Sequence, residues 1–229
     1  LVGLEFESFT NGSSSFKAKV NKKGETLSAG EFSLSVIDVP SYSGEWDKVV
    51  GHDSHVDVFC LQPHVILPQH RTVEYTFGEA SNHFDTAMQI EKIGQLYTGF
   101  YDKIAQATSS YSRAIYSGAF QVALWELVYD FEAPSLFSGN FQERGRGNSV
   151  VGSVASNWLH QLPSIVNTKQ LFVLQSDIAQ DVIFARDMNI DVGGGDSNIE
   201  DVSLVSSIGV LGLSAGLMLA NRRRRATKN

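Results

Sequence analysis

The segment Phe120-Gln121-Val122-Ala123-Leu124-Trp125 lies inside a long apolar run from Ala114 to Val128. A run that is apolar on nearly all sides predicts a buried helix, which we place at residues 113–129. Gln121 breaks the pattern, because its primary amide has several hydrogen-bonding sites and burying the amide unpaired costs a few kcal/mol. We therefore expect this amide either to bond to the backbone of a neighbouring strand or to have been consumed by a reaction.

The reaction would involve the only cysteine of the chain, Cys60, in the segment Phe59-Cys60-Leu61. The residues before it alternate in polarity and predict a strand in which Val56, Val58 and Cys60 share one face. Attack of the Cys60 thiolate on the side-chain carbonyl of Gln121 releases ammonia and leaves an internal thioester. A thioester makes weaker hydrogen-bonding demands than an amide and suits an apolar pocket better. The alternative is an inert buried thiol in a passive domain.

These two segments resemble the two motifs of the bacterial thioester domains found at the tips of surface adhesins. Upstream, Ala29-Gly30-Glu31-Phe32 also resembles sequences of this group, and the resemblance covers about residues 25–185. It implies a β sandwich with a helical subdomain, with the cysteine on a strand and the glutamine on an inserted helix. The covalent pair would be Cys60 and Gln121. The residues expected to support their pocket are Phe59, Leu61, Phe120, Leu124 and Trp125.

Local patterns along the chain agree with that architecture. Up to residue 77 the alternation of apolar and polar residues predicts strands. After Asn82, apolar residues at steps of three and four from Ile90 to Ile104 predict an amphipathic helix. Residues 150–162 predict a further, shorter helix. We place a Ser/Gly-rich loop at residues 41–45. Short strands return from Lys169. The strands expected in this last part are residues 171–174, 181–185 and 188–192.

This order of elements predicts an α+β fold that is mainly β: a β sandwich or barrel, with a helical insertion at about residues 83–163 and a transmembrane helix after the folded domain. The folded domain would span residues 1–190 of the 229, with 42% hydrophobic residues overall. Its acidity argues against binding to nucleic acid. Residues 202–229 hold five bases and no acid, so a net charge of −7 for the whole chain leaves −12 on residues 1–201.

The sequence of the C-terminal region predicts a linker followed by a membrane segment. Residues 191–201 are rich in Gly and Asp, as flexible linkers are. Residues 202–220 carry no charge and would span roughly 28 Å as a helix, close to the thickness of the hydrocarbon core of a bilayer. Four arginines follow, Arg222 to Arg225, and the positive-inside rule assigns them to the cytoplasm. We expect residues 1–201 to lie outside the membrane, at the cell surface.

The tail at residues 202–229 resembles that of the PEP-CTERM class of bacterial surface proteins, whose C terminus is processed by an exosortase. The apolar helix and the arginine cluster match, whereas Ile199-Glu200-Asp201-Val202 stands where the class has Pro-Glu-Pro. Exosortase processing and permanent anchoring therefore both remain open. The chain begins at Leu1, and we expect either that a secretory signal preceded it or that the chain was trimmed.

Five of the six histidines fall within a short part of the sequence: His52, His55, His64, His70 and His83. Their spacing matches no zinc motif, so we expect solvated histidines and no metal; a metal-dependent envelope enzyme is the weakest alternative. His64 and His55 lie nearest to Cys60 in sequence and are candidate general bases for an incoming hydroxyl.

The predicted function follows from the chemistry of acyl transfer. A thiolate is a good leaving group, so a protein amine or a carbohydrate hydroxyl that attacks the Gln121 carbonyl forms an amide or an ester and frees Cys60. The prediction is a surface adhesion or matrix-attachment protein that reacts once, without turnover and without a cofactor. The runner-up is a passive structural or binding protein of the envelope with the same fold and no thioester.

Overall fold

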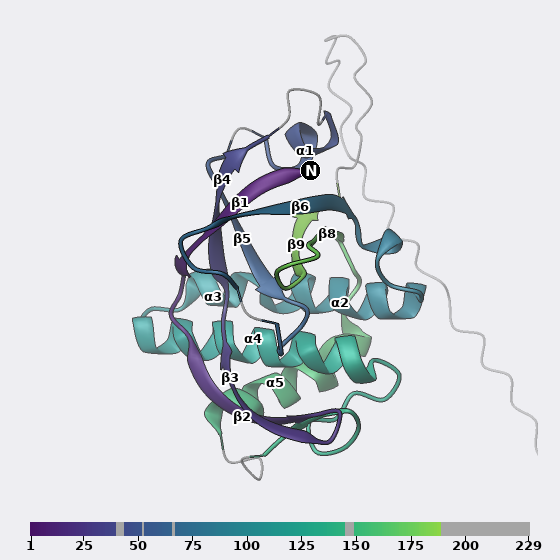
Figure 1. Cartoon of the computed structure of the whole chain (residues 1–229). Helices are drawn as coiled ribbons and strands as arrows, with labels where there is room; N and C mark the ends of the chain where they lie inside the picture. Colours follow the sequence, from purple (N-terminus) through teal and green to yellow (C-terminus); the bar gives the residue numbers. More distant parts are fainter. Residues whose placement is uncertain (40–43, 52, 66, 145–148, 189–229) are drawn as a thin grey trace, which may run out of the picture. The chain divides into compact units, whose positions relative to one another are not determined.

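The computed structural model describes residues 1–39, 44–51, 53–65, 67–144 and 149–188. In this part of the chain a closed barrel of six strands stands beside a group of helices (Figure 1). A separate three-stranded sheet packs, like the barrel, against the long helix Ser110–Asp130. Helices and strands occur in similar amounts. The fold is therefore mixed rather than mainly β.

The barrel has the strand order β1-β4-β5-β9-β8-β6, and every neighbouring pair is antiparallel. Its strands are β1 (Val2–Phe9), β4 (Phe32–Asp38), β5 (His55–Cys60), β6 (Thr72–Glu79), β8 (Lys169–Gln175) and β9 (Val182–Asp187). Side chains alternate across each strand, so Leu4, Leu34 and Val58 point to a common interior and are almost fully buried. Closure brings β5 and β9 together although their residues are far apart in the sequence.

The smaller sheet has the order β3-β2-β7, with β2 (Ser14–Val20), β3 (Lys23–Ala29) and β7 (Phe141–Glu143). A tight turn joins β2 to β3, and its residues Asn21 and Lys22 both have positive φ, as the right-handed twist of a hairpin favours. The third strand comes from within the helical region. Phe141 of β7 pairs with Val20 and stacks on Phe16 at 6.1 Å between ring centroids.

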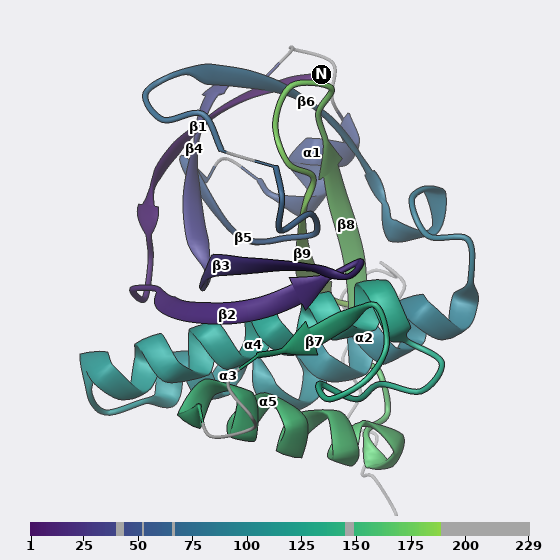
Figure 2. The same ribbon diagram turned by 60° about the horizontal axis from the view of Figure 1, so that its bottom comes forward.

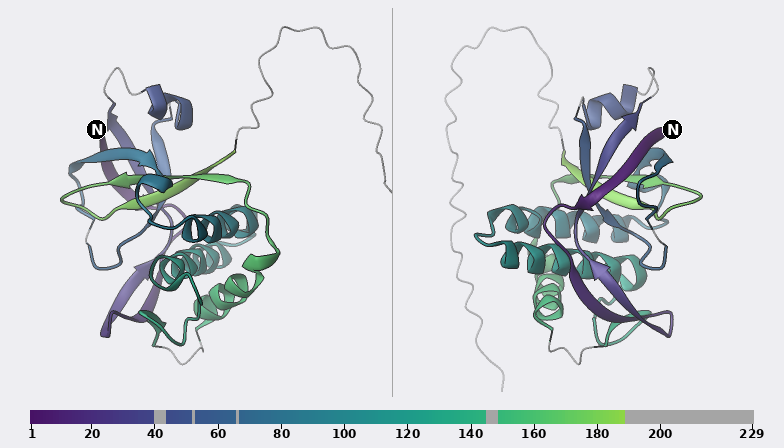
Figure 3. Two further views of the ribbon diagram at one scale, coloured as in Figure 1. Left: turned by 90° about the vertical axis from the view of Figure 1, so that its right-hand side faces the viewer. Right: turned by 60° about the vertical axis from the view of Figure 1, so that its left-hand side comes forward.

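The helices between the barrel strands β6 and β8 gather around α4. They are α2 (Ala87–Phe100), α3 (Asp102–Gln106), α4 (Ser110–Asp130) and α5 (Val150–Gln161). Ser109 caps α4 by accepting a hydrogen bond from the backbone N–H of Ser112. Every residue from Ser117 to Leu127 is buried, because α4 is covered by other helices, by the barrel and by the small sheet (Figures 2 and 3).

The structure confirms a barrel with a helical region inserted between its strands, and it corrects three details. Gly44 and Glu45 belong to a short helix, α1 (Gly44–Val49), rather than to a loop. Trp46 of this helix is buried against Phe77, and this burial stabilises a helix in a polar, Gly-containing segment. Met188 is not in a strand, because β9 ends at Asp187. The amphipathic pattern from Ile90 to Ile104 covers two helices, α2 and α3.

The predicted linker, the predicted transmembrane segment and the arginine cluster lie outside the described residues. Within the described ranges, no helix is both long enough and apolar enough to cross a membrane.

Candidate functional site

The Gln121 side chain of α4 reaches the end of strand β5 and bonds to the backbone of Cys60 at two points. Its Oε1 accepts a hydrogen bond from the Cys60 N–H at 2.9 Å, and its Nε2 donates to the Cys60 carbonyl oxygen at 2.8 Å. Gln121 is 0% exposed and Cys60 is 8% exposed. The two sequence motifs therefore meet in the interior, and the buried amide is not left unpaired.

Strand β4 begins too late to pair with Cys60, which explains why the Gln121 side chain can bond to the backbone of Cys60. Strand β4 pairs with β5 only as far as Phe32, which lies opposite Val58. The N–H of Leu61 bonds to Asp181 on the β9 side, so the backbone groups of Cys60 face the opposite side, beyond the start of β4. The Gln121 amide supplies the donor and the acceptor that a longer β4 would have supplied.

A second residue of α4 bonds to the start of β4. The Ser117 hydroxyl, one helical turn before Gln121, accepts a hydrogen bond from the backbone N–H of Glu31 at 2.6 Å. Ser117 and Gln121 face the same side of the helix because they are four residues apart. Together they attach α4 to the ends of two adjacent barrel strands, which fixes the position of the Gln121 amide against Cys60.

The aromatic residues that precede Cys60 and Gln121 also touch. The rings of Phe59 and Phe120 lie 4.5 Å apart between centroids, and Tyr97 of α2 packs on Phe120 at 4.8 Å. Leu61 and Leu124 are buried as well. Because these side chains are apolar and buried, the two hydrogen bonds lie in an apolar interior.

A cavity of about 300 Å³ reaches Cys60. Its walls are largely apolar and include Phe6, Phe9 and Phe32, and Trp125 and Gln180 also line it. The Trp125 indole N–H is buried, and no described residue accepts its hydrogen bond.

The environment of Cys60 opposes ionisation. Burial raises the pKa of the Cys60 thiol, and a hydrogen bond with the side chain of Gln180 lowers it in part. The pKa of the Tyr75 hydroxyl, on strand β6, is raised by burial and then by the electrostatic effects of Cys60 and Asp181. At neutral pH the thiol is therefore protonated, which limits its reactivity toward solutes.

Sequence reasoning missed Gln180. This residue lies between β8 and β9, about 120 positions from Cys60, as their numbering shows. No local pattern marks it, because its place beside the thiol depends on the pairing of β5 with β9 when the barrel closes.

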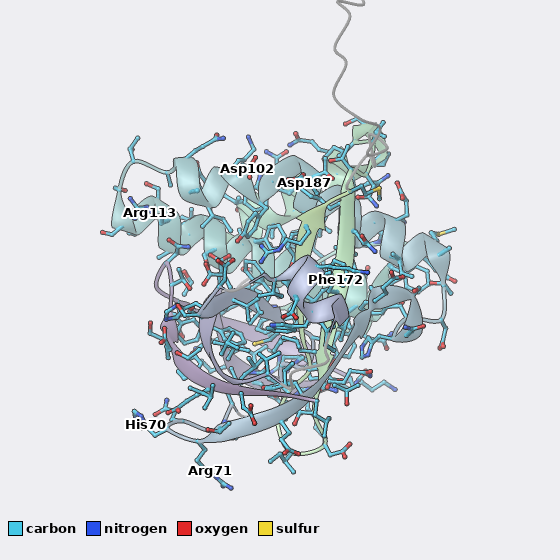
Figure 4. The ribbon with its side chains drawn as sticks, turned by 90° about the horizontal axis from the view of Figure 1, so that it is seen from above. His70, Arg71, Asp102, Arg113, Phe172 and Asp187 are labelled. Atoms are coloured by element: carbon cyan, nitrogen blue, oxygen red, sulfur yellow. The ribbon has the colours of Figure 1, made fainter. Side chains whose placement is uncertain are left out.

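The structure does not bring the histidines together. The His55 Nε2 lies 3.0 Å from a Glu7 carboxylate oxygen, and the His64 Nδ1 lies 2.6 Å from one of Glu25. His83 bonds to Gln175, and Figure 4 shows His70 beside Arg71 at the barrel edge, far from Asp102 and Arg113 on the helices. His52 lies outside the described residues. None of the residues lining the Cys60 cavity is a histidine, and no described group of three or more His, Cys, Asp or Glu side chains could hold a metal ion.

Comparison with known proteins finds matches among solved structures alone. No protein-family model matches the chain, and no curated protein matches it. Among solved structures, the N-terminal thioester domain of a surface protein from Clostridium perfringens aligns with a TM-score of 0.37 and 14% identity, covering 74% of this chain and 97% of that one. A variant of that domain with a cysteine replaced by alanine gives 0.40 and 14%, covering 76% and 99%. Both scores are too low to establish a shared fold.

Proposed function

We propose that this protein is a cell-surface adhesion or matrix-attachment protein that bonds covalently to its target through a thioester between Cys60 and Gln121. The observation that carries the proposal is the pair of hydrogen bonds that holds the Gln121 amide on the backbone of Cys60, the only cysteine. A side-chain amide can form a thioester only if it is held next to a cysteine, as the Gln121 amide is.

Formation of the bond requires no added reagent. The Cys60 sulfur attacks the side-chain carbonyl carbon of Gln121, the C–N bond breaks, and the thiol proton leaves with the nitrogen as ammonia. The Cys60 N–H already bonds to Oε1, so it polarises the carbonyl and stabilises the negative charge that develops on that oxygen. Loss of Nε2 then leaves the Cys60 carbonyl oxygen without this donor.

The second step transfers the acyl group to the target. A protein amine or a carbohydrate hydroxyl attacks the carbonyl carbon, the C–S bond breaks, and the Cys60 sulfur takes up the proton of the nucleophile. The cavity of about 300 Å³ beside Cys60 provides the approach, and its apolar walls keep water away from the thioester before the target arrives. Each molecule reacts once, so the protein is a reagent and not a turnover enzyme.

The location follows from residues outside the described part. The uncharged residues 202–220, followed by Arg222 to Arg225, are proposed to hold the domain at the membrane with residues 1–201 outside, at least until any exosortase processing. A surface position gives the thioester access to amines and hydroxyls of a neighbouring surface or matrix.

Methylamine tests the proposal directly. It should add to the Gln121 side chain, as mapped by peptide mass spectrometry, and expose one titratable thiol per chain. Cys60→Ala should abolish the addition, whereas His64→Ala should retain it because His64 does not line the cavity. Absence of addition in freshly prepared protein with the Gln121 amide intact would contradict the proposal.

The second candidate is a passive envelope protein of the same fold. The observation that favours it is that both ends of the Gln121 amide are already hydrogen-bonded. In that case the amide is a structural link between α4 and β5, and Cys60 is an inert thiol. Methylamine would then leave the protein unchanged.

A further inference from the structure

The loop between β8 and β9 places a second glutamine beside the Cys60 sulfur. Gln180 is 6% exposed and lines the same cavity as Cys60. Its side chain also lowers the pKa of the Cys60 thiol, which burial raises. The sulfur therefore has an amide on the Gln121 side, which is the proposed acyl group, and another amide on the cavity side. The second amide is not consumed by the proposed reaction.

Other buried donors nearby do not bond to the sulfur. The Tyr75 hydroxyl and the Trp125 N–H are both buried, and neither has a hydrogen-bond partner among the described residues. Asp181 follows Gln180, and its carboxylate is already bonded to the Ser176 N–H and to the Gln62 amide. Gln180 is thus the donor of this group whose side chain acts on the pKa of the thiol.

A reciprocal pair of hydrogen bonds holds Gln180 in place. The Gln62 Nε2 donates to Asp181 Oδ2 at 3.0 Å, and the Asp181 N–H donates to Gln62 Oε1 at 3.0 Å. The Leu61 N–H also donates to the Asp181 carbonyl oxygen, at 2.9 Å. Because Gln62 lies two residues after Cys60 and Asp181 lies one after Gln180, these bonds fix the loop relative to the sulfur.

We propose that Gln180 is a catalytic residue of the thioester chemistry, whose amide N–H stabilises the negative charge on the Cys60 sulfur when the sulfur attacks Gln121 and again when it leaves. The Gln62–Asp181 pair positions it. The need for a donor is clear, because a sulfur buried among apolar groups cannot be stabilised by water. This inference rests on the proposed function.

The test compares Gln180→Leu with Gln69→Leu. Gln69 lines the same cavity but is exposed, so it provides the same substitution without loss of a bond to the thiol. In the otherwise wild-type chain, Gln180→Leu should slow the methylamine reaction by about tenfold, equivalent to ~1.4 kcal/mol in the barrier, while Gln69→Leu should not. Gln180→Glu, similar in size and without a donor when ionised, repeats the test if Gln180→Leu fails to fold.

A second arm measures the thiol without the acyl group. In a Gln121→Met chain no thioester can form, and the rate of alkylation by iodoacetamide at one fixed pH follows the thiolate population. Gln180→Leu should lower this rate by about tenfold, whereas Gln69→Leu should leave it unchanged. Thermal unfolding verifies that each variant is folded.

The methylamine and iodoacetamide experiments together distinguish the role of Gln180 from the existence of the thioester. If methylamine adds to the wild type and Gln180→Leu matches Gln69→Leu in both arms, the role of Gln180 is overturned and the thioester stands. If methylamine never adds but Gln180→Leu still slows alkylation, the thioester is overturned and the bond from Gln180 to the sulfur stands.

Discussion

The side-chain amide of Gln121 occupies the position of a strand partner for Cys60, accepting from its N–H at 2.9 Å and donating to its carbonyl oxygen at 2.8 Å. A single side chain thus extends the hydrogen bonding of β5 past the start of β4. The same contact holds an electrophilic carbon beside the only cysteine. One arrangement therefore accounts for both the structural role and the proposed chemistry of this glutamine.

The structural role predicts a loss of stability that is independent of any thioester. In a Cys60→Ala background, where the thioester cannot form, Gln121→Leu leaves the buried N–H and carbonyl at position 60 unpaired. The free energy of unfolding in urea should fall by roughly 2–5 kcal/mol. Gln106→Leu, an exposed control in α3, should change it by less than about 0.5 kcal/mol. Equal stabilities of the two double variants would show that the Gln121 amide is not bonded as described.

The cavity predicts where the nucleophile enters. Val65 lines the cavity, and Val65→Trp should fill part of its volume of about 300 Å³. The methylamine reaction should slow by about tenfold. Formation of the thioester should be unaffected, because that step occurs inside the protein.

The control for the cavity is Val166→Trp, because Val166 is 80% exposed and does not line it. This variant should react at the wild-type rate. If Val65→Trp also reacts at the wild-type rate, the nucleophile reaches the thioester by another route.

The buried carboxyl of Glu31 predicts a pH dependence of stability. Burial raises the pKa of Glu31 from 4.5 to about 7, and bonds from the Tyr101 hydroxyl and the Asn11 amide offset part of that effect. The raised pKa belongs to the folded state, so between about pH 4.5 and about pH 7 the folded chain keeps a proton that the unfolded chain has lost. The free energy of unfolding therefore falls as the pH rises through this range. The full shift corresponds to about 3 kcal/mol.

Urea unfolding at about pH 5 and about pH 8, in the Cys60→Ala background, measures this loss. Glu31→Gln removes the ionisable group and should make the profile flatter. It should not make the profile flat, because the pKa of Glu126 is also raised by burial, to about 8, and contributes in the same direction. A profile for Glu31→Gln as steep as that of the parent would contradict the assignment.

The sequence predicted the parts of the site that depend on local pattern. Alternation up to Cys60 indicated a strand, and the apolar run around Gln121 indicated a buried helix; the structure has β5 and α4 at these places. The misplaced polar amide was itself a signal, because a buried Gln must find partners. Those partners proved to be the backbone groups of Cys60.

What local pattern could not predict depends on distant parts of the chain. Closure of the barrel pairs β5 with β9, and only this pairing brings Gln180 into the cavity that Cys60 lines. The short strand β7 is equally hidden, since Phe141 becomes a strand residue through its pairing with Val20. Helix α1 is stabilised by the burial of Trp46 against the distant Phe77.

The intact mass of the freshly prepared protein shows whether the thioester between Cys60 and Gln121 has formed. The thioester requires the wild type to be lighter than its sequence by one ammonia, while Cys60→Ala and Gln121→Met should each have their full sequence mass. Hydrolysis before measurement would be recognised because it replaces the ammonia by one water and leaves Glu at position 121. A wild-type protein of full sequence mass, with the Gln121 amide intact, would show that no thioester forms.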